Sequence, residues 1–304
     1  MMRPITRFLL ALLIGSLLFS GAVNASGETT EEKETVMKAQ IETIYTDRFS
    51  MDYFRFGRGA ETLVILPGLS VDSVMNYADA VAESYRPLTD NFTFYVFDRR
   101  KELPAAYSIF EMAEDTAAAI RSLGLEHICL FGASQGGMIA MTIAFENPDL
   151  VSKLILGSTS ACLEPEQYQT VDRWVQLAKT RNAKDLYLAF GEAIYPPAVF
   201  EQSGDLLAAA AESVTDENLR RFVILAEGMK GFDVSGRLPE IACPVLVLGS
   251  EDDQVLGADA SRRIANLVTE CQLYMYDCYG HAAYDTAPDY RERMLRFLVP
   301  ASAD

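Results

Sequence analysis

The chain of 304 residues has little histidine, tryptophan, cysteine and positive charge. It contains two histidines, one tryptophan and five cysteines, and 26 basic residues stand against 43 acidic ones, which gives a formal net charge of −17. This acidity argues against nucleic acid and against a stable membrane partner, because nucleic acids and anionic membrane surfaces both require a basic face. Half of the residues are hydrophobic, so a sizeable core can form and wholesale disorder is excluded.

The cysteines show no metal-site spacing and no Cys-x-x-Cys motif. Cys129 and Cys243 adjoin apolar runs and are interpreted as small buried hydrophobic residues. Cys271 and Cys278 flank one expected strand, and seven residues at about 3.3 Å each separate them too widely for a bridge. We therefore expect no disulfide, although an odd number of cysteines hints at a free thiol.

The N-terminus has the layout of a secretory signal peptide. Arg3 and Arg7 precede an apolar stretch over residues 8–19, and Val23-Asn24-Ala25 is a small-x-small cleavage site. We expect residues 1–25 to be removed and the protein to be exported, secreted or held in the cell envelope. The alternative is an uncleaved membrane anchor, because residues 8–25 are almost long enough to span a bilayer.

Strand-like and helical patterns alternate along most of the chain after a polar lead-in over residues 26–44. The strand-like runs cover residues 52–56, 62–66, 92–97, 127–131, 153–156, 244–248 and 272–276. The helical patterns between them cover residues 74–85, 109–123, 138–146, 258–267 and 288–297. Alternation with continuously apolar strands predicts an α/β fold, with a mostly parallel sheet flanked by helices.

One region interrupts this alternation. Residues 162–238 contain only helical patterns, at 167–179, 183–194, 206–213 and 217–228. We interpret this region as a helical cap or lid inserted into a core formed by residues 45–161 and 239–304. The alternative is that these helices simply belong to the main core, and the two interpretations differ in whether the insertion can move.

The most informative motif is Gly132-Ala133-Ser134-Gln135-Gly136-Gly137. It lies between a strand-like run and a helical one, which is the context of a nucleophile elbow, a tight turn that presents a serine hydroxyl. The glycines are required because the turn is strained and the backbone is crowded. Ser134 is therefore the candidate nucleophile.

A serine hydroxyl requires an adjacent base, and only two histidines are available. His127 begins the strand that leads into the elbow, so it would lie roughly 17 Å from Ser134, at the opposite end of the sheet. His281 lies in a glycine-containing loop after the last strand, at the edge where α/β sites are built. His281 is the predicted base.

The base requires a carboxylate to orient it. Glu251, Asp252 and Asp253 follow the strand-like run 244–248, and the order Ser, Asp, His along the chain matches this type of elbow. We predict Asp252, with Asp253 as the main alternative. For the oxyanion hole we predict the backbone N–H groups of Gln135 and of Leu69, which lies in the early loop Leu66–Ser70.

These motifs resemble the α/β-hydrolase fold superfamily, and specifically its lidded group of esterases, lipolytic enzymes, C–C hydrolases and perhydrolases. The resemblance rests on Gly132–Gly137, Gly249–Asp252 and Gly280-His281, and it covers the chain from about residue 45 to its end. It departs from the pattern at Pro67-Gly68, where many relatives have His-Gly. The branches with an aspartate nucleophile are disfavoured because position 134 is serine.

The resemblance implies a serine hydrolase that cleaves an ester or related small acyl substrate through an acyl-enzyme, with no metal or organic cofactor. Alternatives are a C–C hydrolase, thioesterase or acyltransferase with the same triad, or a non-catalytic binding protein on the same fold.

Two further features of the sequence could contribute to substrate binding. Asp98–Lys101 could bind an anionic group, although an acid at this place mostly holds loops together, and Trp174 with nearby aromatic residues could line an acyl pocket or simply pack.

Overall fold

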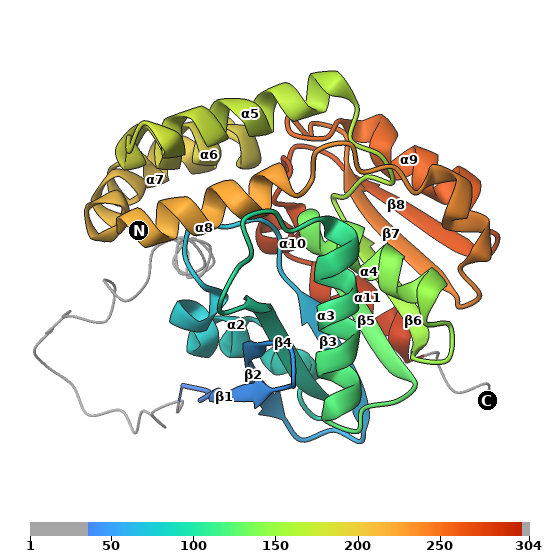
Figure 1. The fold of residues 1–304 in the computed structure, drawn as a ribbon. Coiled ribbons are helices and arrows are strands. Elements are labelled where there is room, and N and C mark those ends of the chain that lie inside the picture. Colours follow the sequence, from blue (N-terminus) through green and yellow to red (C-terminus); the bar gives the residue numbers. More distant parts are fainter. Residues whose placement is uncertain (1–35, 300–304) are drawn as a thin grey trace, which may run out of the picture.

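The computed structural model describes residues 36–299 (Figure 1). The predicted signal peptide, residues 1–25, lies outside the described residues, as does most of the predicted lead-in. None of the helices in the described range is both long and apolar enough to cross a membrane.

Eight strands form one sheet in the order β1-β2-β4-β3-β5-β6-β7-β8. They are β1 (Gln40–Tyr45), β2 (Ser50–Gly57), β3 (Glu61–Leu66), β4 (Phe92–Arg100), β5 (Ile128–Ala133), β6 (Val151–Gly157), β7 (Val245–Ser250) and β8 (Cys271–Tyr276). The pairs β1–β2 and β2–β4 are antiparallel, and every other pair is parallel. Every residue of β5 and β7 is buried, as expected for parallel strands that helices cover on both faces.

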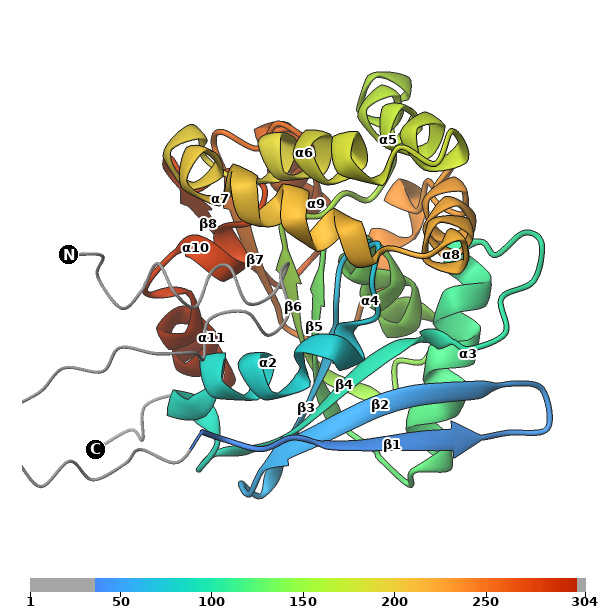
Figure 2. The ribbon, with the colours of Figure 1, turned by 90° about the vertical axis from the view of Figure 1, so that its left-hand side faces the viewer.

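Helices cover both faces of this sheet (Figures 1 and 2). One face packs against α3 (Ile109–Ser122), α4 (Gln135–Glu146) and α9 (Ala258–Leu267). The other packs against α2 (Ala78–Ser84), α10 (Ala283–Thr286) and α11 (Tyr290–Leu298). In β5, Leu130 belongs to the first core and Phe131 to the second, because successive side chains of a strand point to opposite faces. The α/β architecture predicted from the sequence is confirmed.

Four consecutive helices lie between β6 and β7 and form a separate layer above the sheet (Figure 1). They are α5 (Pro165–Lys179), α6 (Ala183–Ile194), α7 (Pro197–Ala210) and α8 (Asp216–Glu227). We call this layer the cap. It touches the loops at the carboxyl ends of the strands: the Ala282 N–H donates to the Ile194 carbonyl at 2.9 Å. Whether the cap opens and closes stays a prediction.

The short helix α10 is not among the predicted helices, and two further elements differ from the sequence prediction. The lead-in predicted over residues 26–44 includes most of β1, which pairs with β2 from Gln40↔Arg55 to Tyr45↔Ser50. As an edge strand, β1 is half exposed and carries no continuous apolar run that would mark it. In the cap, α7 begins at Pro197 and not near residue 206, because proline is favoured in the first turn of a helix.

Candidate active site

Ser134 occupies a strained turn between β5 and α4. Its φ of 50° and ψ of −120° are a conformation that residues with a side chain seldom adopt. The turn is held from the neighbouring strand: the Ser134 N–H donates to the Gly157 carbonyl at 2.9 Å, and the Thr159 hydroxyl donates to the Ser134 carbonyl at 2.7 Å. The structure thus places Ser134 at the strand-to-helix junction that the motif predicted.

The glycines of the motif allow backbones to approach closely. A Cβ on Gly132 would lie 2.4 Å from the Gly136 carbonyl oxygen, and one on Gly136 would lie 2.0 Å from the Leu66 carbonyl oxygen. Real Cβ atoms do not approach backbone oxygens this closely, so both positions require glycine. The helix α4 can therefore begin directly against the end of β3.

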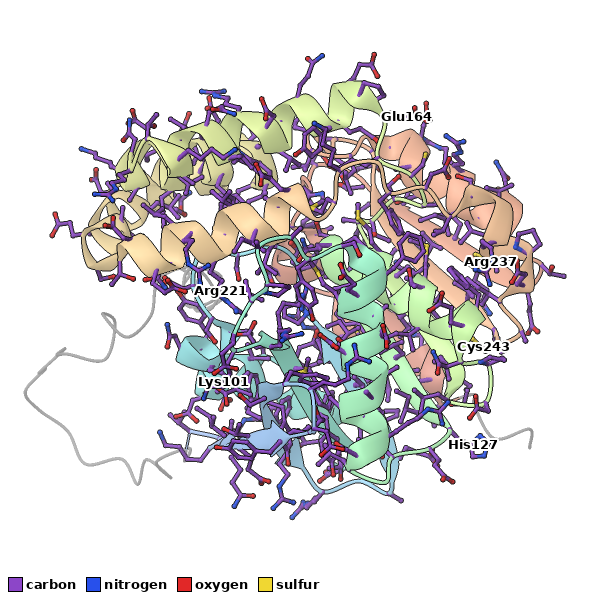
Figure 3. The ribbon with its side chains drawn as sticks, in the orientation of Figure 1. Lys101, His127, Glu164, Arg221, Arg237 and Cys243 are labelled. Atoms are coloured by element: carbon purple, nitrogen blue, oxygen red, sulfur yellow. The ribbon has the colours of Figure 1, made fainter. Side chains whose placement is uncertain are left out.

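His281 is the histidine that meets Ser134. Its Nε2 lies 2.9 Å from the Ser134 Oγ, and the residue is 2% exposed. Gly280 precedes it with a φ of +63°, which lets the loop after β8 turn back under the cap. His127 is exposed just before β5, at the end of the sheet away from the cap (Figure 3). The predicted choice between the two histidines agrees with this geometry.

The carboxylate that meets His281 belongs to Asp253, so the prediction of Asp252 is wrong. Asp253 Oδ2 lies 2.9 Å from His281 Nδ1. Its other oxygen accepts from the N–H groups of Val255 and Leu256 at 2.8 and 2.9 Å. Asp252 points away because adjacent side chains diverge, and its Oδ1 accepts from the Gly280 N–H at 3.0 Å.

The surroundings of Asp253 keep it ionised although it is buried. Burial by itself raises the pKa of this carboxyl, but the His281 ring and the two backbone amides outweigh that effect. The pKa of Asp253 consequently lies below its ordinary value. With an anionic partner at Nδ1, the ring carries its proton there and leaves the Nε2 lone pair facing the serine hydroxyl.

The loop after β3 lies against the nucleophile candidate. A Cβ on Gly68 would lie 3.2 Å from Ser134 Cβ and 3.8 Å from Ser134 Oγ, so a larger residue would crowd the hydroxyl. Leu69 follows Gly68 and Gln135 follows Ser134 in the chain, and the role of their N–H groups as oxyanion donors stays a prediction. Within residues 36–299, the backbone N–H of Leu69 and that of Gln135 donate no hydrogen bond to another protein group. Both donors are therefore available to a bound group.

Comparison with known families agrees with this geometry. The family model described as serine aminopeptidase, S33, matches residues 105–285, more than half of the chain, and the match contains Ser134, Asp253 and His281. The chain belongs to this family. It is therefore a hydrolase of the α/β-hydrolase superfamily, as the resemblance of its motifs implied.

Curated relatives of this S33-family chain include proteins named as the carbamate hydrolase RutD. The protein from Agrobacterium fabrum (strain C58 / ATCC 33970) is 28% identical over 226 residues, which cover 70% of this chain and 85% of the relative. The protein from Pseudomonas syringae pv. syringae (strain B728a) is 27% identical over 251 residues, covering 79% and 94%.

Solved structures share the fold. MGS-M2, an α/β hydrolase enzyme from a Medee basin deep-sea metagenome library, superposes with a TM-score of 0.77 at 21% identity, covering 86% of this chain and 99% of that one. The enol-lactonase from Burkholderia xenovorans LB400 gives a TM-score of 0.74 at 18% identity, covering 84% and 99%. At these sequence identities, the similarity shows a shared fold.

Polar contacts join the cap of the S33-family chain to the core around the site. Asp72, just after the Gly68 loop, accepts from the Tyr187 hydroxyl of α6 at 2.7 Å and from the Asn218 side chain of α8 at 3.2 Å. Arg221 of α8, which Figure 3 labels, pairs with Asp98 near the end of β4 at 2.7 Å. Asp98 also accepts from the Ser73 hydroxyl in the segment after β3, so it holds neighbouring segments together, which was the favoured interpretation.

The aromatic residues of the cap mainly pack on one another. Trp174 in α5 is 3% exposed, and its ring centroid lies 4.6 Å from that of Phe190 in α6. Phe190 in turn meets Phe222 of α8 at 6.3 Å. These contacts make Trp174 a core residue of the cap, consistent with the packing interpretation of its helical spacing.

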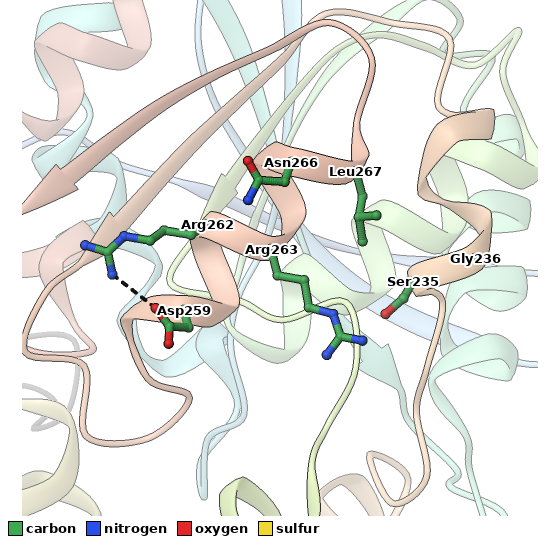
Figure 4. Close-up of a pocket in the computed structure, with 7 residues that line it drawn as sticks. All are labelled: Ser235, Gly236, Asp259, Arg262, Arg263, Asn266 and Leu267. Atoms are coloured by element: carbon green, nitrogen blue, oxygen red, sulfur yellow. Dashed lines mark hydrogen bonds and ion pairs between the residues drawn. The ribbon is translucent and has the colours of Figure 1, made fainter.

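A hollow lies away from the site, between α9 and the short helix η4 (Ser235–Glu240) (Figure 4). Its volume is about 630 Å³. The guanidinium groups beside it are already paired, Arg262 with Glu251 and Asp259, and Arg263 with Glu164.

No group of three or more His, Cys, Asp and Glu side chains in the described range could hold a metal ion.

Proposed function

We propose that the chain is a serine hydrolase that cleaves an ester or related acyl compound through a covalent acyl-enzyme. One observation carries the proposal: a hydrogen-bonded chain runs from Ser134 Oγ to His281 Nε2 at 2.9 Å, and from His281 Nδ1 to Asp253 Oδ2 at 2.9 Å. All three side chains are buried beneath the cap, where electrostatic interactions are strong.

The first half of the proposed reaction forms the acyl-enzyme. Ser134 Oγ attacks the carbonyl carbon while His281 Nε2 takes the hydroxyl proton, and Asp253 stabilises the resulting imidazolium. The N–H groups of Leu69 and Gln135 donate to the oxyanion that develops. When the tetrahedral intermediate collapses, the bond to the leaving alcohol breaks and His281 returns the proton to that oxygen.

The second half releases the acid. Water enters, loses a proton to His281 Nε2 and attacks the acyl carbon. Collapse of this intermediate breaks the bond to Ser134 Oγ, which regains its proton from His281. The carboxylic acid leaves and the enzyme returns to its starting state.

The names of the relatives support a substrate in which a heteroatom leaves a carbonyl carbon. RutD is named for carbamates, and structures with the same fold include a lactonase and a thermophilic esterase from Thermogutta terrifontis. Attack by a serine on a carboxylic ester, a lactone or a carbamate gives the same kind of tetrahedral intermediate. C–C hydrolysis, thioester hydrolysis and acyl transfer with the same residues stay predictions of the sequence.

Replacement of the nucleophile tests the proposal. Ser134→Ala should lower the kcat for a p-nitrophenyl ester on the order of 10⁶-fold and abolish labelling by a fluorophosphonate. Ser203→Ala is the control, because Ser203 is also buried but donates to the Val199 carbonyl within the cap. Equal activity in the Ser134→Ala and parent proteins would rule out this nucleophile, and absence of labelling in the folded parent would favour a binding protein.

We also propose that the protein is exported, on the basis of the leader pattern in residues 1–25. Expression of the full chain followed by mass spectrometry of the mature protein is the test. Export with cleavage predicts a new N-terminus at Ser26, whereas an anchor predicts a protein of full length in the membrane fraction.

A further inference from the structure

Arg99 is a buried cation beside the candidate site that the proposed reaction does not use. It lies near the end of β4 and is 3% exposed. Its Nη2 donates to the Pro67 carbonyl at 2.8 Å and to the Gln135 side-chain oxygen at 3.2 Å. Pro67 begins the loop that carries the Leu69 N–H, and Gln135 carries the other donor. One nitrogen atom thus contacts both halves of the oxyanion site.

Keeping a guanidinium here costs free energy. Burial lowers the pKa of Arg99 to about 10, so the group remains charged at neutral pH although it is removed from water. The hydrogen bonds of its guanidinium go to a carbonyl and an amide oxygen and not to a carboxylate, although the charge of the adjacent Asp98 partly offsets the effect of burial on its pKa. The Arg99 Nε has no hydrogen-bond partner. A hydrophobic side chain of similar length would fill this space without that cost, so simple packing does not account for the residue.

Gln135 extends the contact to the cap. The residue is fully buried, and its side-chain amide donates to the Leu225 carbonyl of α8 at 2.7 Å while its oxygen accepts from Arg99. Both ends of the side chain are therefore fixed. Its backbone N–H, at the first position of α4, is held in place by these two bonds together with the glycine contacts of the turn.

We propose that Arg99 is a positioning residue that sets the separation of the two oxyanion donors. It holds the Pro67 carbonyl and the Gln135 side chain on one nitrogen, and so keeps the N–H groups of Leu69 and Gln135 aimed at one point. The inference rests on the proposed function, because it concerns the charge that develops after attack by Ser134. Displacements of about 1 Å in such a site can cost on the order of 100-fold in rate.

The test compares Arg99→Met with the parent, with a p-nitrophenyl ester as substrate. We expect kcat to fall by about 10- to 100-fold while KM changes less than about twofold, because the donors act on the transition state and not on the bound substrate. Affinity for a trifluoromethyl ketone, which forms an oxyanion on the serine, should fall by the same factor as kcat. Arg99→Lys, which keeps a cationic donor, should recover part of the loss.

Arg100→Met is the matched control. Arg100 follows Arg99 on the same strand, but it pairs with Asp115 at 3.4 Å, away from the oxyanion loops. We expect its kcat and its ketone affinity to equal those of the parent. Equal losses in the two variants, or a folded Arg99→Met protein with unchanged kcat, would overturn the inference.

A second variant covers the case in which Arg99→Met does not fold. Gln135→Met removes the acceptor on one side and leaves the bond from Arg99 to Pro67 in place, so kcat and ketone affinity should fall together there as well. Unchanged values would overturn the inference. These outcomes are separate from failure of the proposed function, which would appear as full activity in Ser134→Ala.

Discussion

Asp252 and Asp253 are adjacent in the chain and hold the site in different ways. Asp253 meets the imidazole of His281, whereas Asp252 accepts from the backbone N–H groups of Tyr279 and Gly280 at 3.2 and 3.0 Å and from the Ser250 hydroxyl at 2.7 Å. The Asp253 carboxylate therefore orients the imidazole ring, and the Asp252 carboxylate holds the loop that carries His281.

The two aspartates should respond differently to replacement by asparagine. Asp253→Asn should lower kcat by about 10³- to 10⁴-fold, because an amide favours the wrong tautomer of His281 and does not stabilise the imidazolium. Asp252→Asn is the control and should cost less than about tenfold, because its amide oxygen still accepts from the loop. Steady-state hydrolysis of a p-nitrophenyl ester measures both. A larger loss in Asp252→Asn would reverse the assignment.

The geometry agrees with the sequence prediction for histidine, a scarce residue type, and differs from it for aspartate, an abundant one. With two histidines, position along the strands was enough to separate His281 from His127. Three consecutive acids offered no such signal, because the choice depends on which way the turn after β7 rotates. That rotation is fixed by the amides of Val255 and Leu256, which cap the Asp253 carboxylate. Arg99 was visible only as part of a charged segment.

At the scale of elements, the turn from β5 to α4 depends on how closely α4 approaches the end of β3. Gly136 in α4 lies against the Leu66 carbonyl, where a Cβ would be 2.0 Å from the oxygen. Gly204 in α7 has nothing within 4 Å of the place of its Cβ. Glycine is thus required by close packing at position 136 and is not required at position 204.

Alanine at these two glycines should change stability in opposite directions. Gly136→Ala should lower the free energy of unfolding by about 3 kcal/mol or more, because backbone must move to admit the methyl group. Gly204→Ala should raise it by about 0.5–1 kcal/mol, because alanine is the better helix former. Urea unfolding of both variants measures the difference, and equal midpoints would contradict the close approach of α4 to β3.

The cap is attached to the core through a small number of polar groups as well as through packing. Burial and the neighbouring Asp72 raise the pKa of the Tyr187 hydroxyl, so it stays protonated and donates to that carboxylate. Asp72 lies four residues beyond Gly68, so the same loop that borders Ser134 also anchors α6.

Removal of this hydroxyl should loosen the cap. Tyr187→Phe should cost about 1.5–3 kcal/mol of stability, the usual range for a hydrogen bond to a charged group. Tyr168→Phe is the control, because the Tyr168 hydroxyl in α5 makes no hydrogen bond within the described range, and its ring packs against the Lys230 ammonium. Thermal unfolding of both proteins tests this, and equal melting temperatures would contradict a stabilising contact.

The elements themselves were largely predictable. Continuous apolar runs marked β3, β5 and β7, since parallel strands are buried on both faces. The edge strand β1 has neither a buried face nor clear alternation, so local pattern could not separate it from a polar lead-in. The cap was recognised because strands are missing over 162–238, yet its packing on the core depends on contacts far apart in sequence.

At the scale of the whole molecule, stability comes from the core and not from covalent cross-links. All five cysteines are free, as the sequence predicted. Cys278 is exposed, Cys271 is half-buried and the other three are buried, where burial raises the thiol pKa values of Cys129 and Cys243. The exposed thiol is therefore that of Cys278, in the loop after β8.

Thiol titration tests this description. The native protein should react rapidly with a disulfide reagent at Cys278 alone, and all five thiols should react after denaturation without reductant. Dithiothreitol should leave the melting temperature unchanged, and Cys278→Ser should remove the rapid phase. Fewer than five thiols in the denatured protein would reveal a disulfide that the structure does not contain.

The position of Trp174 has a practical consequence. It is the only tryptophan in the chain, and it lies in the cap, against Phe190. Tryptophan fluorescence of the native protein therefore originates entirely in the cap, with no contribution from the sheet. Its emission, recorded during a single turnover, would report on the surroundings of Trp174 in the cap in real time, without an attached dye.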